Sequence, residues 1–237
     1  MGKYRIADIL VEMSPKYSRL LRQSERYKVQ TEQKADFGIF LSDEFLQEKQ
    51  DANPHLPIGD CEYIWAGSDF YHKLLDYDGI MLHSSCVAVN GKAYLFSAPS
   101  GTGKSTHTNL WKEKFGDDLV FVNDDKPALR FFEGRVFACG TPFSGKTDLN
   151  SNCKFPLAGI CLLHRAETNS IKEADKSLAV KKIFTQILRP KEQLAMINTL
   201  EILNKILSVV PVYDLYCNMD KSAADLSYAY MSEHSII

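Results

Sequence analysis

Apolar residues occur along this chain both in the continuous runs typical of strands and at the spacing typical of helices. The first third contains two strand-like runs, at residues 4–13 and 35–41. Ser42 and the two acidic residues after it favour a helix start, because a serine oxygen can accept a hydrogen bond from a free N–H group of the first turn. Residues 61–77 carry aromatic and aliphatic side chains that suit a packed helix. The first third is therefore expected to mix α and β structure.

The middle of the chain begins with a hairpin signal. Asn90 and Gly91 separate two apolar runs, and both residues tolerate the positive φ of a type I′ turn. The second strand of this hairpin leads directly into a glycine-rich segment at 98–105. A helix at 106–115 and a short buried strand at 119–122 are expected next, so a strand, a glycine-rich loop, a helix and a strand follow in order.

The remaining residues continue the alternation of strands and helices. A second hairpin is expected at 128–138, with its turn at Glu133 and Gly134. Pro190 separates two stretches with helical spacing, because proline disfavours helix at the residue before it. The other expected elements are a strand at 157–163, helices at 174–188 and 191–209, a strand at 212–217 and a helix at 222–232.

The length and this pattern predict one α/β domain. A chain of 237 residues can bury a complete core, and no internal repeat or low-complexity segment interrupts it. We expect a single domain over 1–237, with an N-terminal α+β part at 1–79 and a nucleotide-binding core at 80–237.

Charge and cysteine usage restrict the partners. Lys and Arg total 28 against 30 for Asp and Glu, so no general attraction to nucleic acid or to a membrane surface is expected. The six cysteines stand singly, without the short paired spacings of a zinc site or redox motif, and are expected to be buried thiols. No signal peptide or membrane-spanning run is evident, which favours a cytoplasmic protein. Assembly into a homo-oligomer stays open.

The glycine-rich segment matches the Walker A phosphate-loop pattern, with alanine in the position of the first glycine. Two glycines allow the backbone to wrap an anion with its N–H groups turned inward, and the helix that follows adds its dipole. The lysine would neutralise the β and γ phosphates of ATP, and the serine after it would ligate Mg²⁺. The expected nucleotide-binding residues are Ser100, Gly101, Thr102, Gly103, Lys104, Ser105 and Thr106.

Asp124 and Asp125 follow the strand expected at 119–122. A phosphate-loop site needs a carboxylate near the magnesium-binding serine, and a second carboxylate can accept the proton of an attacking hydroxyl. The alternative is an Asn-Asp-Asp turn that merely closes the strand. Because the pair comes after a phosphate loop, the functional interpretation is favoured.

Three motifs resemble the catalytic core of HPr kinase and its relatives, in the order found in that family. They are the runs 83–92, 97–106 and 122–125. The loop at 100–106 is also similar to that of phosphoenolpyruvate carboxykinase, which shares the nucleotide-binding architecture. The resemblance covers about residues 80–150 and implies an α/β fold in which a mixed sheet with flanking helices carries the phosphate loop.

The resemblance also implies roles for individual residues. Asp124 would be the base that acts on the acceptor hydroxyl, while Asp125 and Ser105 would hold the metal. His83 would line the site near the transferred phosphoryl group. A single histidine on a strand is more often structural, so for His83 the structural and functional interpretations are equally favoured. Asp124, His83 and Lys104 are therefore the expected catalytic residues.

The chain also departs from HPr kinase. The residues before His83 are too few for that family's separate N-terminal domain, and its acidic signature has no counterpart at 156–165. HPr is thus not the expected acceptor. The shorter HPr-kinase-like proteins are more similar, and some of these phosphorylate serine on ribosomal peptides such as lasso-peptide precursors. Lys146, in a glycine-flanked segment at 140–146, is expected to contact substrate or phosphate unless that segment is simply a solvated turn.

The function that the sequence favours is Mg²⁺- and ATP-dependent phosphoryl transfer to a hydroxyl, with serine of a peptide, protein or small molecule as acceptor. Two alternatives stay open. A regulatory module could bind nucleotide without turnover, or the chain could be a carboxykinase-like metabolite enzyme. The second alternative would require a further metal held by His and Lys, together with an arginine-rich site, and no such cluster is evident in the sequence.

Overall fold

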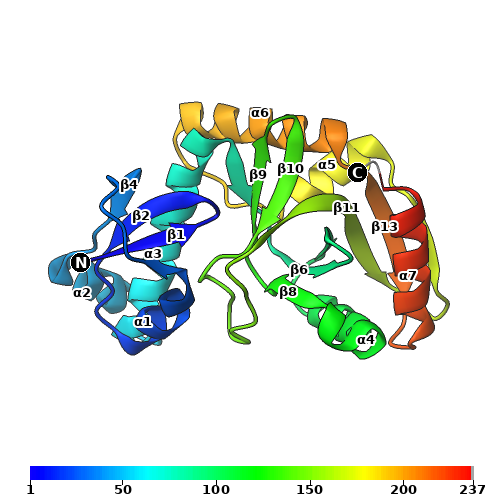
Figure 1. The fold of residues 1–237 in the computed structure, drawn as a ribbon, viewed down its shortest axis with the longest axis horizontal. Helices are drawn as coiled ribbons and strands as arrows, with labels where there is room; N and C mark the ends of the chain where they lie inside the picture. Colours follow the sequence, from blue (N-terminus) through cyan, green and yellow to red (C-terminus); the bar gives the residue numbers. More distant parts are fainter. Residues whose placement is uncertain (236–237) are drawn as a thin grey trace.

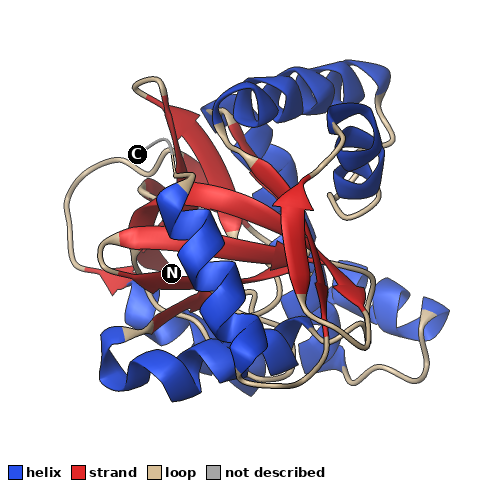
Figure 2. Cartoon of the chain, turned by 90° about the vertical axis from the view of Figure 1, so that its right-hand side faces the viewer, coloured by secondary structure: helices blue, strands red, loops and turns tan. Residues whose placement is uncertain are grey.

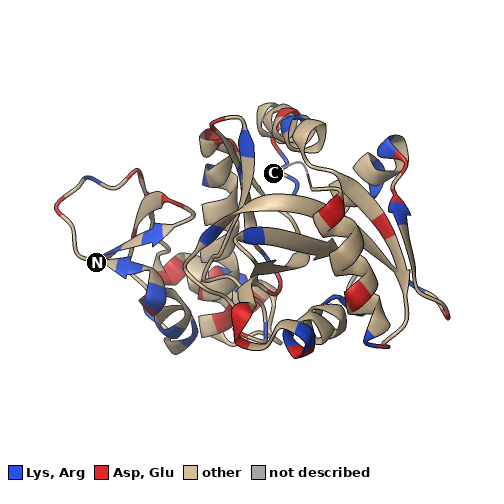
Figure 3. Ribbon diagram, turned by 45° about the vertical axis from the view of Figure 1, so that its right-hand side comes forward, with Lys and Arg blue, Asp and Glu red and all other residues tan. Residues whose placement is uncertain are grey.

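The computed structural model describes residues 1–235, which form two sheets with helices packed around them (Figures 1 and 2). A four-stranded sheet is built from the N-terminal residues, and a nine-stranded sheet from the rest of the chain. Acidic and basic residues are intermingled over the ribbon (Figure 3). None of the helices formed by the described residues is both long enough and apolar enough to cross a membrane.

The N-terminal sheet has the strand order β3-β1-β2-β4. Its strands are β1 Gly2–Ile6, β2 Ile9–Met13, β3 Lys28–Val29 and β4 Phe37–Ile39. The run at 4–13, expected as a strand, is instead a hairpin whose turn is formed by Ala7 (φ 52°) and Asp8 (φ 62°). These are the positive φ values of a type I′ turn, but no glycine or asparagine marks it in the sequence.

Helical segments complete the N-terminal part of the chain. They are α1 Ser18–Ser24, η1 Glu25–Tyr27, α2 Asp43–Ala52, α3 Ile58–Lys73 and η2 Leu74–Tyr77. The helix start expected at Ser42 is confirmed, since its hydroxyl accepts a hydrogen bond from the N–H of Phe45 at 3.1 Å. The buried face of α3 joins a core that also includes Phe143, from a loop of the larger part. The N-terminal part is therefore packed directly onto that loop.

The large sheet has the order β5-β9-β10-β11-β7-β6-β8, and β13 and β12 continue from the far side of β11. The hairpin turns expected at Asn90-Gly91 and Glu133-Gly134 are confirmed, and all four residues have positive φ. The strands are β5 Gly79–Met81, β6 Ser84–Val89, β7 Lys92–Ser97, β8 Val120–Asn123, β9 Ala128–Phe132, β10 Arg135–Cys139, β11 Lys154–Arg165, β12 Ser170–Glu173 and β13 Val212–Cys217.

The long strand β11 joins the two halves of this sheet. Its first residues pair with β10 in antiparallel fashion, whereas its later residues lie between β7 and β13 in parallel. A register shift between Leu157 and Gly159 separates the two pairings, and such an irregularity bends a strand. The expected strand at 157–163 is therefore part of a longer, bent one, which gives the sheet its curled and mixed character.

Helices cover both faces of the parallel region. The helices α4 Lys104–Phe115 and α7 Ser222–Glu233 lie on one face, and α5 Lys176–Phe184 and α6 Gln193–Val209 lie on the other. Alternate residues of β7 and β11 face opposite helix pairs, so the strands are apolar on both sides. All six cysteines are free, and only Cys153 is not fully buried, so the expectation of a buried thiol is wrong there.

The strand order brings three chain segments to one edge of the large sheet. Because β6 is antiparallel to β7, Ser84 at its start pairs with Ser97 at the end of β7. Because β8 is antiparallel to β6, Asn123 at its end pairs with Cys86. The residues that follow β7, precede β6 and follow β8 therefore meet, and these are the glycine-rich loop, His83 and the aspartate pair.

Candidate active site

The glycine-rich loop connects the carboxyl end of β7 to the first turn of α4. Gly101 has φ +78° and Gly103 has φ +120°, values that residues with side chains rarely adopt. The helix begins at Lys104 rather than at Thr106 as expected, with Gly103 as its N-cap. The loop thus ends at a helix N-terminus, the arrangement that attracts anions.

Lys104 is buried, with 8% of its surface exposed, and its ammonium group donates to the carbonyl of Ala98 at 2.9 Å. Burial lowers the pKa of Lys104, and the negative charges of Asp125 and Asp124 oppose this shift. The expected phosphate-binding lysine and the two aspartates are therefore close enough to interact.

Arg165, which the sequence analysis did not single out, braces the phosphate loop. Its guanidinium group donates to the carbonyl of Thr102 at 3.0 Å and also to the carbonyl of Gly101. The two loop carbonyls therefore point toward Arg165, which is the last residue of β11. No local sequence signal marks this role, because the arginine and the loop are separate in the chain and meet only through strand pairing.

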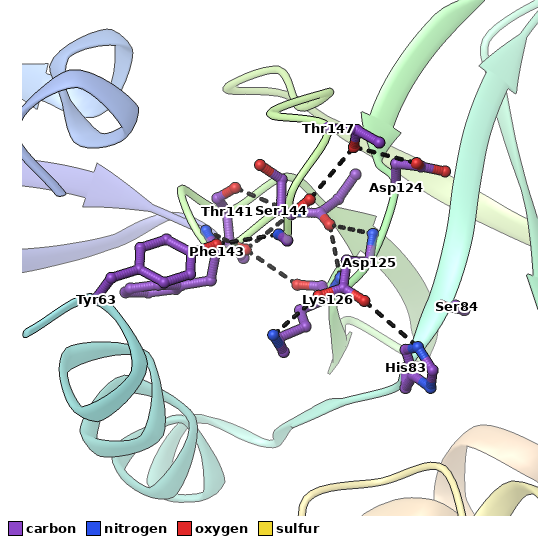
Figure 4. Close-up of polar contacts among 12 residues, drawn as sticks. Tyr63, His83, Ser84, Asp124, Asp125, Lys126, Thr141, Phe143, Ser144 and Thr147 are labelled. Carbon is purple, nitrogen blue, oxygen red and sulfur yellow. Dashed lines mark hydrogen bonds and ion pairs between the residues drawn. The ribbon is translucent and has the colours of Figure 1, made fainter. Parts of the chain in front are cut away.

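Asp124 is 6% exposed, and its carboxylate accepts hydrogen bonds from two hydroxyl groups. One carboxylate oxygen accepts from Ser85. The other accepts from Thr147 at 3.2 Å (Figure 4). The Ser85 hydroxyl is also 2.9 Å from the hydroxyl of Thr108, on α4. Asp124 is therefore tied to the helix that follows the phosphate loop. Ser85, Thr108 and Thr147 were not foreseen from the sequence.

Asp125 lies between two basic side chains (Figure 4). One of its oxygens is 3.4 Å from His83 Nε2, and the other is 2.9 Å from the ammonium group of Lys126. Burial opposes ionisation of Asp125, but hydrogen bonds and charge from His83 and Lys126 prevail and lower its pKa to about 2. Asp125 is therefore a carboxylate at neutral pH. The other ring nitrogen of His83 is 3.0 Å from the side-chain oxygen of Gln186.

The side chain of Asn123 stabilises the turn that contains Asp124 and Asp125. Its side-chain oxygen accepts from the backbone N–H groups of Asp125 at 2.9 Å and Lys126 at 2.7 Å. Its amide group donates to the backbone carbonyl of Thr141 at 3.0 Å. The Asn-Asp-Asp segment is thus a turn that closes a strand, as the alternative interpretation held, and the same turn carries both carboxylates.

A loop at 140–150 covers the aspartates. The two ends of this loop lie close together. A side-chain carbon at Gly140 would be only 1.7 Å from the backbone oxygen of Ser151. Thr147 reaches Asp124 from this loop, but Lys146 is exposed and makes no hydrogen bond or ion pair with the described residues. The contact of Lys146 with substrate or phosphate stays a prediction.

The N-terminal part of the chain holds this loop in place. The buried hydroxyl of Tyr27 donates to the side-chain oxygen of Asn150 at 2.7 Å, and Arg26 donates to its backbone carbonyl. At the tip, the Gly145 N–H donates to the hydroxyl of Tyr63 at 3.0 Å, and Arg19 donates to the Gly145 carbonyl at 2.8 Å. The loop beside Asp124 is therefore anchored at its tip and at its C-terminal end.

Replacing Tyr27 by phenylalanine tests this anchoring. The change leaves the Asn150 oxygen without its buried donor, so the free energy of unfolding should fall by about 1–3 kcal/mol, measured by urea denaturation. Tyr216→Phe serves as a control, because the Tyr216 hydroxyl makes no hydrogen bond with the described residues. Equal stability of the Tyr27 and Tyr216 variants would contradict the anchoring role.

The oxygen groups near the loop suit Mg²⁺ bound mainly through phosphate. Mg²⁺ is typically held by one or two protein oxygens together with phosphates and water. Ser105 in the first turn of α4 and the ionised Asp125 are donors of this type. Among residues 1–235 no cluster of three or more His, Cys, Asp or Glu side chains could enclose a metal alone. The site therefore fits a metal that arrives with a nucleotide.

Comparison with known proteins gives matches among solved structures. No protein-family model matches the chain, and no curated protein sequence matches it. Among solved structures, the chain is similar to the HPr(Ser) kinase/phosphatase from Coxiella burnetii, with 12% sequence identity and a TM-score of 0.37. The similarity covers 65% of this chain and 97% of that chain.

Proposed function

We propose that this protein is an ATP- and Mg²⁺-dependent kinase that transfers a phosphoryl group to a hydroxyl of a peptide, protein or small molecule, with serine as the expected acceptor. The observation that carries the proposal is the contact of Thr147 with Asp124. A hydroxyl donates to a carboxylate within electrostatic reach of the phosphate-loop lysine. A hydroxyl acceptor requires this same contact with a general base.

In the proposed reaction the acceptor hydroxyl replaces Thr147 on Asp124. The acceptor oxygen attacks the γ-phosphorus, the bond from that phosphorus to the β–γ bridging oxygen breaks, and the hydroxyl proton passes to Asp124. Lys104 and the N–H groups of the loop stabilise the charge that develops on the phosphate oxygens. ADP and the phosphorylated acceptor are the products.

Ser105 and Asp125 are the residues proposed to hold Mg²⁺. A bound ion would supply positive charge that offsets the negative charge of the phosphates. His83 and Lys126 occupy the two oxygens of Asp125, so at least one contact must loosen when the metal–nucleotide complex binds. Lys126 is the residue proposed to exchange, because its flexible stem allows its ammonium group to move toward a phosphate instead.

Removal of Mg²⁺ should abolish phosphoryl transfer, since without the cation the carboxylate of Asp125 would repel the phosphates. The measurement is transfer from labelled ATP to serine-containing peptides and to free serine, with and without excess EDTA. Restoring Mg²⁺ should restore the rate, which controls for loss of the fold. Full activity in excess EDTA would remove the metal role from the proposal.

The same assay separates the kinase from the two alternatives. A regulatory nucleotide-binding module would bind labelled ATP but release no ADP with any acceptor. A carboxykinase-like enzyme would form or consume a carboxylated metabolite and would leave serine unmodified. Formation of phosphoserine together with ADP supports the kinase proposal alone.

A further inference from the structure

The hydroxyl of Thr147 already has the position that the proposed function requires of an acceptor. It donates to one carboxylate oxygen of Asp124, the proposed base, at 3.2 Å (Figure 4). A general base must lie within hydrogen-bond reach of the proton that it removes. A hydroxyl of the chain itself therefore meets this condition before any external acceptor binds.

Exposure distinguishes Thr147 from the other hydroxyl that donates to Asp124. Ser85 donates to the second carboxylate oxygen, but it is 0% exposed and its hydroxyl also contacts that of Thr108, which is buried as well. Thr147 is exposed. Of these two hydroxyls, that of Thr147 is therefore the one that a nucleotide entering from solvent can reach.

The loop that carries Thr147 passes close to the second aspartate as well. Two residues before Thr147, Gly145 (φ +71°) approaches Asp125 so closely that a side-chain carbon built on the glycine would lie 2.9 Å from the carboxyl carbon. In the proposed function the γ-phosphate lies beside these two carboxylates. Thr147 therefore belongs to the segment that covers the place of transfer.

Basic side chains next to Thr147 suit a phosphate at this position. Lys146 is exposed and makes no hydrogen bond or ion pair with the described residues. Arg22, whose side chain is 68% exposed, is 3.8 Å from Asp148, the residue after Thr147. A phosphorylated threonine gains negative charge that lysine and arginine attract. These two side chains could therefore offset the charge of a phosphate on Thr147.

We propose that Thr147 is an autophosphorylation site, which accepts the γ-phosphoryl group when no other acceptor is bound. The Thr147 oxygen attacks the γ-phosphorus, the bond from that phosphorus to the β–γ bridging oxygen breaks, and the hydroxyl proton passes to Asp124. ADP leaves, and the threonine keeps the phosphate. The proposal rests on the proposed function, because it uses the same base and the same nucleotide.

Incubation of wild type with labelled ATP and Mg²⁺, without an acceptor, tests the site directly. Peptide mass spectrometry should place the phosphate on Thr147 and not on Ser151, the next hydroxyl residue along the chain. The initial rate per chain should be independent of protein concentration, because Thr147 contacts the Asp124 of its own chain. An added serine-containing peptide should slow the labelling, since both hydroxyls need the same base.

Four variants identify the hydroxyl and the base. Thr147→Val keeps the branched shape of the side chain but removes the oxygen, so labelling should be lost, whereas Thr147→Ser keeps a hydroxyl and should be labelled. Asp124→Asn should slow labelling by about 10²- to 10⁴-fold. Ser151→Ala is the matched control, because it removes a nearby hydroxyl that makes no hydrogen bond with the described residues, and it should be labelled like wild type.

The outcomes separate this site from the proposed function. Transfer to a serine-containing peptide with no phosphate on Thr147 would overturn the autophosphorylation site and leave the kinase proposal intact. Full labelling of Thr147→Val, or a rate per chain that rises with protein concentration, would also overturn it. Absence of transfer both to the peptides and to Thr147 would contradict the proposed function and this site together.

Discussion

Asp124→Asn is expected to bind ATP as tightly as wild type and to transfer phosphate about 10² to 10⁴ times more slowly. Asparagine keeps the shape of the side chain and can still pair with the hydroxyls of Ser85 and Thr147, so the fold should persist. It cannot take up the proton of an acceptor hydroxyl. The measurements are ATP affinity by calorimetry and the single-turnover rate with the best serine-containing acceptor.

Asp125→Asn is the matched control, since the two aspartates are neighbours on one turn with different partners. Asp125 contacts His83 and Lys126 rather than hydroxyls, and its carboxylate is the proposed metal ligand. Its variant should need more Mg²⁺ to reach half-maximal rate, because a neutral amide binds the ion more weakly. If Asp124→Asn transfers phosphate at the wild-type rate, the base assignment is wrong. If the two variants exchange their phenotypes, the two roles must be exchanged as well.

Lys104→Ala is expected to weaken ATP and tripolyphosphate binding equally, by about 10- to 100-fold, because a hydrogen bond to a charged group typically contributes about 1.5–3 kcal/mol. Lys104→Ala removes the bond to the Ala98 carbonyl, but the loop backbone should keep its shape because its glycine conformations and the bonds from Arg165 remain. Fluorescence titration with an ATP analogue and competition by tripolyphosphate provide the two affinities.

Lys112→Ala is the control for Lys104→Ala, because it removes a lysine from the same helix at a position paired with Asp117 and Gly116. Its nucleotide affinity should equal that of wild type. A folded Lys104→Ala protein with unchanged affinity would show that the loop does not hold the β and γ phosphates.

The phosphate loop and its surroundings could be predicted from the sequence because their signals are local. A strand, two glycines, a lysine and a helix follow one another within a few residues, and each acts on its immediate neighbours. The turn at Asn90-Gly91 was predictable for the same reason. The turn at Ala7-Asp8 was not, because alanine rarely adopts positive φ and no glycine or asparagine marks this turn.

The sequence by itself determined the elements that carry the candidate chemistry: the glycine-rich loop at a helix N-terminus and an aspartate pair after a strand. Only the tertiary structure decided their partners. Arg165 and Gly101 are 64 positions apart, and His83 and Gln186 are 103 apart, and they meet because of the order of strands and the packing of α5. Thr147 reaches Asp124 because the N-terminal part anchors its loop. Such contacts depend on strand order and long-range packing, which local patterns of polar and apolar residues do not specify.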